Sequence, residues 1–139
     1  MASQAGYSAT PLTRKLGIKA DATVVLVSAP GDFEKTLGDL PPGAVLRRGN
    51  RGRRGITIWF VTSKADLERR WVAIAEAVGE GTLWVAWPKQ SSELAGDMTE
   101  DRVRDVALPR GLVDTKVCAI DADWSGLRLT RRRSKVGST

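Results

Sequence analysis

Histidine is absent from this 139-residue chain, and cysteine occurs once, as Cys118. Without histidine the chain cannot form a Ser-His-Asp or Cys-His nucleophile, and it lacks the most common general base and metal ligand. A single cysteine excludes an internal disulfide and any metal site built on paired cysteines. Catalysis would therefore depend on carboxylates, lysine or tyrosine, and we predict no metal site.

Long hydrophobic runs are also missing. No segment approaches the roughly 18 consecutive apolar residues of a membrane-spanning helix, and the N-terminal MASQAGYSAT has no charged region followed by an apolar core. We therefore expect a cytoplasmic protein that has no membrane partner. The length and the hydrophobic content of 42% predict a single domain over residues 1–139, with residues 1–9 and 132–139 as flexible tails.

Positive charge is plentiful but unevenly placed in a chain whose net charge is +6. Nine cationic residues lie in the loop RRGNRGRRG and the tail RRRSK: Arg47, Arg48, Arg51, Arg53, Arg54, Arg131, Arg132, Arg133 and Lys135. The rest of the chain therefore has a net charge of −3, which is +6 minus the nine positive charges of these two segments. The arginine loop and the basic tail are either solvated surface or contacts to the phosphates of a nucleic acid.

Apolar patterns predict the strands. Continuous runs rich in β-branched and aromatic residues, typical of strands covered on both faces, occupy residues 23–29, 56–63 and 82–87. A weaker run lies at 44–48. Two further strands, at 112–120 and 126–132, are separated by the turn-forming sequence DADWS, which favours an antiparallel pair.

Helix signals lie between these runs. A short helix is predicted at 10–17, with Thr10 as N-cap and Pro11 at the first helical position, and another at 33–37. The clearest helix begins at Ser63 and ends at Gly79, with an apolar stripe on one face. A last helix begins at Asp97 or Thr99 and stops before residue 109.

The alternation predicts an α/β fold, namely a three-layer Rossmann-like, mostly parallel sheet with an antiparallel C-terminal edge strand. The closing helix and strands resemble the end of the Rossmann-like methyltransferase fold. Residues 49–55 join the strand at 44–48 to the strand at 56–63, and they are too few for a helical crossover. They form either an extended connection across the sheet or the turn of a hairpin.

The motifs that bind a nucleotide cofactor in such a fold are missing. A methyltransferase uses a glycine-rich turn after its first strand and an acidic residue at the end of its second strand, which holds the ribose. Here the turn is SAPGDF, with one glycine, and the second strand ends in Arg47 and Arg48. We therefore predict no cofactor, and a divergent S-adenosylmethionine-dependent methyltransferase is retained as an alternative.

Ligands of open parallel sheets bind beyond the carboxyl ends of the strands. The candidate ligand-binding residues near these ends are Ser28, Pro30, Gly31, Ser63, Lys64, Trp87, Lys89 and Trp124. Lys64 and Lys89 lie near predicted helix N-termini, which favours an anionic small molecule or an acidic protein partner; they are otherwise solvated surface. Trp87 and Trp124 stand at strand ends, where an indole ring can face a ligand.

The remaining unusual side chains are predicted to be structural. Trp59, Trp71 and Trp84 lie in buried runs and are assigned to the core. Cys118 lies within a strand and is interpreted as a small core residue. Asp121 and Asp123 lie in a turn, where aspartate bonds nearby backbone.

Several motifs resemble one family of short bacterial proteins, the domain of unknown function 3052. These motifs are GYSATPLTRKLGIK, VLVSAP, FEKTLGDLPPG, FVTSKADLERR, LWVAWPK, MTEDRVRDVALPRGLVDTKVCAID and WSGLRL. The resemblance runs from about Gly6 to Arg133 but does not include the arginine loop. It implies a small Rossmann-like cytosolic protein and supplies no reaction or catalytic residue.

Three functions are consistent with the sequence. We expect a binding domain rather than an enzyme, with an anionic small molecule or an acidic protein at the carboxyl ends of the strands. The first alternative is nucleic-acid binding without sequence preference, through the arginine loop and the basic tail. The second is the divergent methyltransferase. The sequence identifies neither the ligand nor the oligomeric state.

Overall fold

The computed structural model describes residues 11–132; the tail expected at residues 1–9, and the chain from Arg133 onward, lie outside this range. In chain order the elements are α1 (Leu12–Lys15), β1 (Thr23–Val27), α2 (Phe33–Leu37), β2 (Val45–Arg48), β3 (Ile56–Phe60), α3 (Lys64–Val78), β4 (Thr82–Pro88), α4 (Glu100–Ala107), the 3₁₀ helix η2 (Leu108–Arg110), β5 (Leu112–Ala119) and β6 (Trp124–Arg131). Within residues 11–132, no helix is both long and apolar enough to span a membrane.

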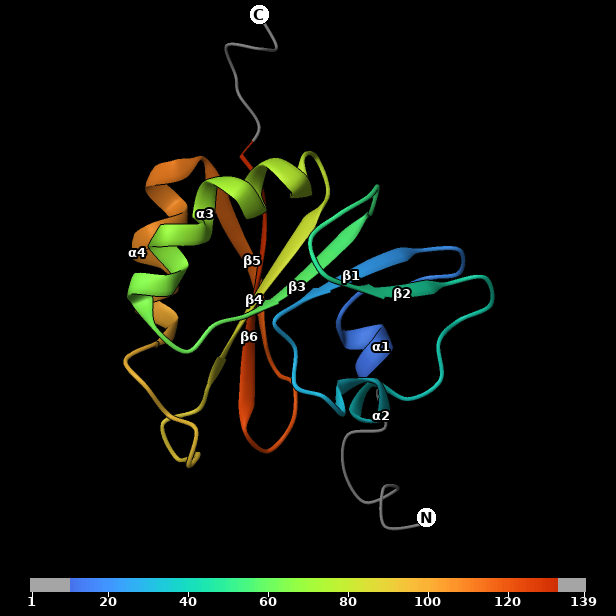
Figure 1. Cartoon of the computed structure of the whole chain (residues 1–139), viewed down its shortest axis with the longest axis horizontal. Coiled ribbons are helices and arrows are strands. Elements are labelled where there is room, and N and C mark those ends of the chain that lie inside the picture. Colours follow the sequence, from blue (N-terminus) through green and yellow to red (C-terminus); the bar gives the residue numbers. More distant parts are fainter. Residues whose placement is uncertain (1–10, 133–139) are drawn as a thin grey trace, which may run out of the picture.

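One six-stranded sheet forms the centre of the molecule, in the order β2-β1-β3-β4-β6-β5 (Figure 1). β2, β1, β3 and β4 are parallel, with Val24 opposite Ile56 and Ile58 opposite Trp84. The three long apolar runs of the sequence therefore lie side by side and point the same way. The expected mostly parallel α/β sheet is confirmed.

The antiparallel strand has a different place from the one expected. β6 is antiparallel to both of its neighbours, β4 and β5, so it lies inside the sheet, and β5 forms the edge. The connection through α4 leaves a gap one strand wide between β4 and β5. β6 returns into this gap, where its backbone N–H and C=O groups find partners on both sides.

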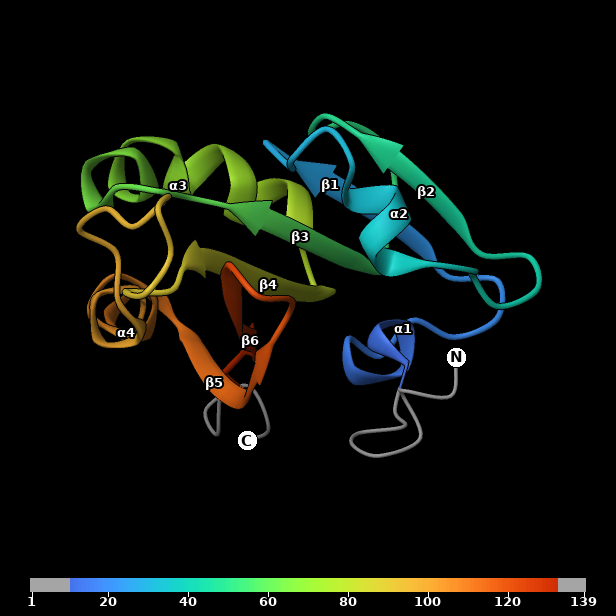
Figure 2. The ribbon, with the colours of Figure 1, turned by 90° about the horizontal axis from the view of Figure 1, so that it is seen from below.

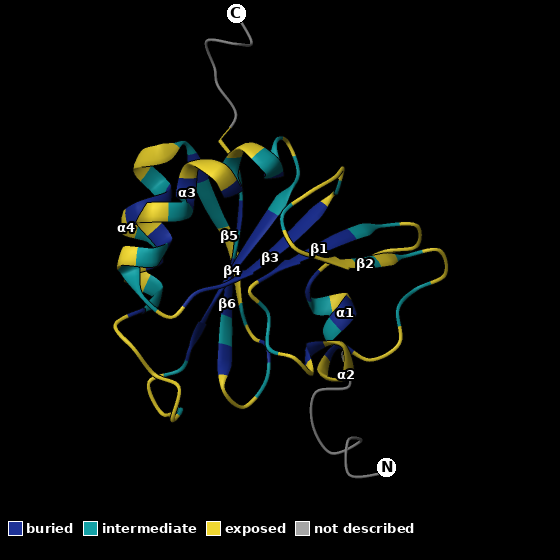
Figure 3. Ribbon diagram, viewed as in Figure 1, coloured by how far each residue is buried: buried dark blue, intermediate teal, exposed yellow. Residues whose placement is uncertain are grey.

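Helices cover both faces of the sheet, which gives the expected three layers (Figure 2). α3 and α4 pack on one face, where Leu67, Trp71 and Val103 belong to the same core cluster as Trp59 of β3. α1 and α2 lie against the opposite face, where Phe33 belongs to a second cluster. The central strands are buried along almost their whole length, whereas β2 and the outer faces of the helices are exposed (Figure 3).

Local capping explains where the two longer helices begin. The Ser63 hydroxyl accepts the Asp66 N–H at 3.1 Å at the start of α3, and the Thr99 hydroxyl accepts the Arg102 N–H at 3.2 Å at the start of α4. Both fit the N-cap preference for small hydroxyl side chains. Of the two predicted starts of α4, Thr99 is the one observed.

α1 begins one residue later than the sequence predicts, at Leu12. Pro11 holds the N-cap position of α1 (φ −60°, ψ 150°), and Thr10 lies outside the described residues. Pro11 is therefore a cap rather than the first helical residue, because its ψ is extended. At the other end, Arg132 is fixed in the structure, since its backbone N–H donates to the Gly111 carbonyl at 2.8 Å.

The connection from β2 to β3 crosses the sheet in extended form. β1 lies between β2 and β3, so these two strands do not form a hairpin. The Gly49 N–H donates to the Leu26 carbonyl, and the Gly55 N–H donates to the Thr23 carbonyl, so residues 49–55 run back along β1. The Asn50 amide donates to the Ala73 carbonyl of α3 at 3.5 Å, which places the crossover on the α3 face.

Candidate ligand-binding site

A pocket of about 450 Å³ lies at the carboxyl edge of the sheet, where the chain order reverses on either side of β1. This reversal point is where open α/β sheets bind ligands. The β1–α2 loop, α2, the end of β3, the β4–α4 loop and the β5–β6 turn contribute its lining residues: Ser28, Pro30, Asp32, Phe33, Thr36, Thr62, Leu94, Asp121, Asp123 and Trp124.

Ser28 forms one side of the pocket in an unusual backbone conformation. Its φ is 58°, in the left-handed region that residues other than glycine rarely adopt. The Arg70 guanidinium of α3 donates to the Ser28 hydroxyl at 3.0 Å. This contact helps to hold the turn that follows β1, and strained turns of this kind are found at ligand sites.

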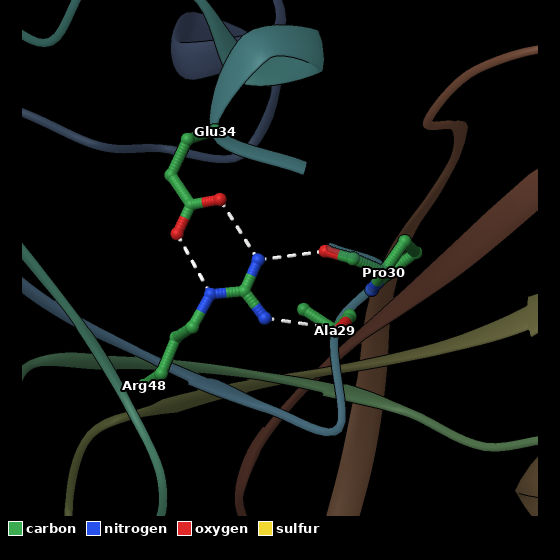
Figure 4. A network of polar contacts seen from close by, with 4 residues as sticks. All are labelled: Ala29, Pro30, Glu34 and Arg48. Carbon is green, nitrogen blue, oxygen red and sulfur yellow. Dashed lines mark hydrogen bonds and ion pairs between the residues drawn. The ribbon is translucent and has the colours of Figure 1, made fainter. Parts of the chain in front are cut away.

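Arg48, the last residue of β2, clamps the β1–α2 loop (Figure 4). Its guanidinium donates to both carboxylate oxygens of Glu34 at 2.8 Å, to the Ala29 carbonyl at 3.1 Å and to the Pro30 carbonyl at 2.6 Å. The Arg48 guanidinium lowers the pKa of the Glu34 carboxyl from 4.5 to about 2. The end of the second strand thus carries a clamped cation, where the methyltransferase pattern has an acid that binds ribose.

The β5–β6 turn forms the opposite side of the pocket. Asp121 accepts the backbone N–H groups of Asp123 and Trp124 at 2.8 and 2.9 Å, which confirms its predicted role in the turn. The Asp123 carboxylate accepts the Ser92 hydroxyl at 3.0 Å and so joins the turn to the β4–α4 loop. The Trp124 ring packs edge-on against Phe60, with ring centroids 5.0 Å apart. Trp124 is therefore a largely buried wall of the pocket.

The lining is acidic. Asp32, Asp121 and Asp123 contribute carboxylates, and no lysine or arginine is among the lining residues. The Asp32 side chain has no hydrogen-bond or ion-pair partner within residues 11–132. Ser28, Thr36 and Thr62 add hydroxyl groups. In the described part of the chain, no group of three His, Cys, Asp or Glu side chains is placed so that it could hold a metal ion.

Three of the eight sequence-predicted ligand residues line the pocket: Ser28, Pro30 and Trp124. Gly31 belongs to the same loop but is not part of the lining. Ser63 caps α3, and the Trp87 side chain is 6% exposed in the core beneath α3 and α4, outside the pocket lining, so its predicted contact with a ligand stays a prediction. Its position on β4 puts it on the same face as Val85, where helices cover it.

Neither predicted lysine lines the pocket. The Lys64 backbone N–H donates to the Asp97 carboxylate at 2.9 Å, and the Lys89 backbone N–H donates to the Asp123 carbonyl at 2.8 Å. Both residues are close in sequence to the carboxyl edge, but the pocket does not include their side chains. The expected anion site at these lysines stays a prediction.

The lining residues that the sequence did not predict as ligand-binding are Asp32, Phe33, Thr36, Thr62, Leu94, Asp121 and Asp123. One available signal was the direction of β5. A strand parallel to β4 must end at the same edge of the sheet as β1 and β3, and so must the turn that follows it. The predicted antiparallel pair therefore implied that Asp121 and Asp123 lie at this edge.

The arginines proposed for nucleic-acid contact have several different environments. Arg48 is the clamp described above. The Arg47 guanidinium donates to the Arg53 carbonyl at 2.6 Å, and the Arg54 guanidinium donates to the Asn50 side chain at 2.7 Å. The side chains of Arg51 and Arg53 are exposed and have no partner within residues 11–132.

The tail arginines contact helix ends. The Arg131 guanidinium donates to the Gly79 carbonyl at the C-terminus of α3, at 3.1 and 3.2 Å. The Arg132 guanidinium donates to the Leu108 carbonyl at 3.3 Å. Cations are favoured at helix C-termini, where carbonyl groups lack partners. Arg133 lies outside the described residues.

Solved structures with similar folds include a SAM dependent methyltransferase from Aquifex aeolicus, with a TM-score of 0.60 and 12% identity over 86% of this chain and 87% of that one. A ribosomal protein L11 methylase from Lactobacillus delbrueckii subsp. bulgaricus has a TM-score of 0.57, with 9% identity over 88% and 75% of the two chains. A protein in the NADB-Rossmann superfamily from Streptococcus agalactiae has a TM-score of 0.58, with 7% identity over 93% and 71%. At these identities the likeness establishes the fold alone.

No curated protein matches the sequence. One family model matches residues 52–133, more than half of the chain, from the middle of the arginine loop to the end of β6. Its description is that of a protein of unknown function, DUF3052. This matched region contains Thr62, the β4–α4 loop and the β5–β6 turn, which contribute five of the ten lining residues of the pocket. The chain thus belongs to the DUF3052 family.

Proposed function

We propose that this protein is a binding domain whose small-molecule ligand occupies the pocket at the carboxyl edge. The observation that carries this proposal is the acidic lining in a chain of net charge +6. Three carboxylates around one cavity repel an anion and attract a cation, and their oxygens accept hydrogen bonds from amines and hydroxyls. The favoured ligand is therefore a small molecule with a cationic group or several hydroxyls.

The expected anionic ligand has weaker support. It depends on Lys64 and Lys89, and neither side chain belongs to the pocket. An anion in the pocket would lie against the carboxylates of Asp32 and Asp123 rather than against these lysines. A cationic ligand and an anionic ligand lead to opposite experimental results, so one experiment distinguishes the two hypotheses.

A methyltransferase is the second candidate, because its methyl donor carries a cationic sulfonium and similar folds include such enzymes. The pocket lies at the edge where that fold class binds its cofactor. Against it stand the single-glycine turn and the Arg48 clamp. We therefore place it second, and S-adenosylmethionine serves as one of the probes.

The test is a thermal-shift panel with spermidine, adenosine, S-adenosylmethionine and citrate. A ligand present at about 100 times its Kd stabilises the fold by about 2.7 kcal/mol, which raises Tm by several degrees. We expect a cationic or hydroxyl-bearing probe to stabilise the protein and citrate to have no effect. Stabilisation by citrate alone that is lost in Lys89→Ala would overturn the proposal and support the anion site.

Matched variants identify the pocket. Asp32→Asn removes a lining charge that has no partner in the described structure, whereas Asp39→Asn removes the same charge from an exposed position outside the lining. The probe's effect should shrink in Asp32→Asn and persist in Asp39→Asn. Equal effects of the two substitutions would show that only overall charge matters. Methyl transfer activity, or tight binding of S-adenosylmethionine alone, would instead favour the methyltransferase.

A further inference from the structure

The arginine loop, residues 47–55, is a second charged surface and lies outside the pocket lining. It is called the arginine crossover below, because it connects β2 to β3 across β1. It leaves β2 at the carboxyl edge and returns along β1 to the start of β3 on the α3 face. None of its residues lines the pocket. Its side chains are those of arginine and asparagine alone, separated by glycines. A ligand of this surface must therefore be recognised through charge and hydrogen bonding.

The crossover concentrates positive charge without neutralising it. Arg48 pairs with Glu34, but Arg47, Arg51, Arg53 and Arg54 have no carboxylate partner within residues 11–132. Arg47 and Arg54 are held by uncharged acceptors of the crossover itself. Burial, together with the nearby charge of Arg47, lowers the pKa of Arg54. The fold thus holds like charges close together, an arrangement that a bound polyanion relieves.

Arg131, where the basic tail begins, lies in the same part of the molecule. Asn50 of the crossover donates to the Ala73 carbonyl of α3, and Arg131 donates to the Gly79 carbonyl at the end of that helix. β6 is antiparallel to β4, so its last residues lie at the amino edge, where the crossover also ends. The crossover and Arg131, which are far apart in the sequence, therefore both contact the C-terminal half of α3.

We propose that the arginine crossover binds the phosphate backbone of a nucleic acid without sequence preference. Protein interfaces draw much of their energy from buried aromatic and aliphatic side chains, and stable membrane anchoring adds inserted apolar side chains or a lipid chain to the basic residues. The crossover itself has neither, and the exposed valines on the neighbouring elements are Val45 of β2 and Val72 of α3. Phosphate binding needs only charge and guanidinium hydrogen bonds, which the crossover supplies.

Arg51→Gln/Arg53→Gln is the test variant, because these exposed side chains make no contact that the fold needs within residues 11–132. Lys19→Gln/Lys35→Gln removes the same two charges from exposed positions elsewhere and serves as the matched control. Each full-length protein is titrated with a labelled 20-base-pair DNA of arbitrary sequence at 50 and 200 mM salt. Unchanged Tm values establish that all three proteins are folded.

With four phosphate contacts, affinity for duplex DNA falls about 150-fold between these salt concentrations, and with two contacts it falls about 12-fold. We expect the loss of about 150-fold for the unmodified chain and for the Lys19→Gln/Lys35→Gln control. For Arg51→Gln/Arg53→Gln we expect the loss of about 12-fold, together with weaker binding at 50 mM salt. A scrambled DNA sequence should bind equally well. The proposal is overturned if the unmodified chain does not bind at 50 mM salt, or if both double variants behave alike. Binding to vesicles of anionic lipid, without binding to DNA, would also overturn it and assign the surface to membranes.

Discussion

At the residue scale, two tryptophans are equally buried but differ in whether the indole N–H has a hydrogen-bond partner. Trp59 and Trp84 are both 0% exposed and belong to the clusters on opposite faces of the sheet. Burying each ring contributes a gross stabilisation of about 4–6 kcal/mol. The Trp84 indole N–H donates to the Leu16 carbonyl at 3.0 Å, whereas that of Trp59 has no partner within the described structure.

This difference leads to a comparison of two substitutions. Trp84→Phe leaves the Leu16 carbonyl without its donor, while Trp59→Phe removes an N–H that is already unpaired, so Trp84→Phe should lower the free energy of unfolding by about 1–2 kcal/mol more. Both substitutions shorten a fully buried ring, so each serves as the other's volume control. Urea unfolding gives the two free energies. Equal losses would mean that the bond to Leu16 contributes little to stability.

At the element scale, the Arg48–Glu34 pair joins the end of β2 to α2 and holds the β1–α2 loop between them. The pKa of Glu34 is about 2 in the folded protein, below its ordinary value of 4.5. A carboxyl whose pKa is lowered by folding stabilises the folded state at every pH above its pKa in the unfolded chain. This stabilisation is lost as the pH falls toward the pKa of the folded state. The stabilisation from this clamp is therefore present above pH 4.5 and disappears between pH 4.5 and about 2.

An NMR titration of the Glu34 side chain measures this effect directly. We expect a midpoint near pH 2 in the unmodified chain, and one moved back toward 4.5 in Arg48→Gln, because the hydrogen bond from Arg48 is the main cause of the lowered pKa of Glu34. Asp39, an exposed carboxyl outside the clamp, provides a reference signal in the same spectra. A Glu34 midpoint near 4.5 in the unmodified chain would show that the clamp is open in solution.

Most elements of the fold could be predicted because their signals are local. The hydroxyls of Ser63 and Thr99 mark helix starts, and the buried run at 56–60 marks a strand on its own. The position of β6 and the path of residues 49–55 could not be predicted in this way. Both depend on which strand lies beside which, and that is decided by long-range pairing rather than by the residues in the segment.

At the scale of the whole molecule, the same limit applies to the site. The β1–α2 loop was identified from its place after a strand, and Ser28 and Pro30 do line the pocket. Lys64 and Lys89 were chosen for their charge, but sequence position does not give side-chain direction. Asp121 and Asp123 join the pocket because β5 ends at the same carboxyl edge as β1, a strand nearly 100 residues earlier in the chain.

The strand pattern also determines how the molecule unfolds. Alternate residues of β3 and β4 face opposite ways, so Trp59 and Val85 belong to the core under α3 and α4, while Ile58 and Trp84 belong to the core on the α1 and α2 face. Both cores are built on the same backbone hydrogen bonds. Neither can be lost while the other survives, and we expect one cooperative, two-state transition.

Fluorine NMR of the protein labelled with 5-fluorotryptophan tests this with one probe on each face. The native signals of Trp59 and Trp84, assigned from the two phenylalanine variants, should lose intensity at the same urea concentration, because the sheet that carries both rings breaks as a unit. Trp71 on α3 shares the first core and should follow Trp59. If the Trp84 signal disappeared at lower urea while Trp59 and Trp71 stayed native, the side of the sheet covered by α1 and α2 would be a separate unit. The pocket, which takes Phe33 from that side, would then open before the rest of the fold.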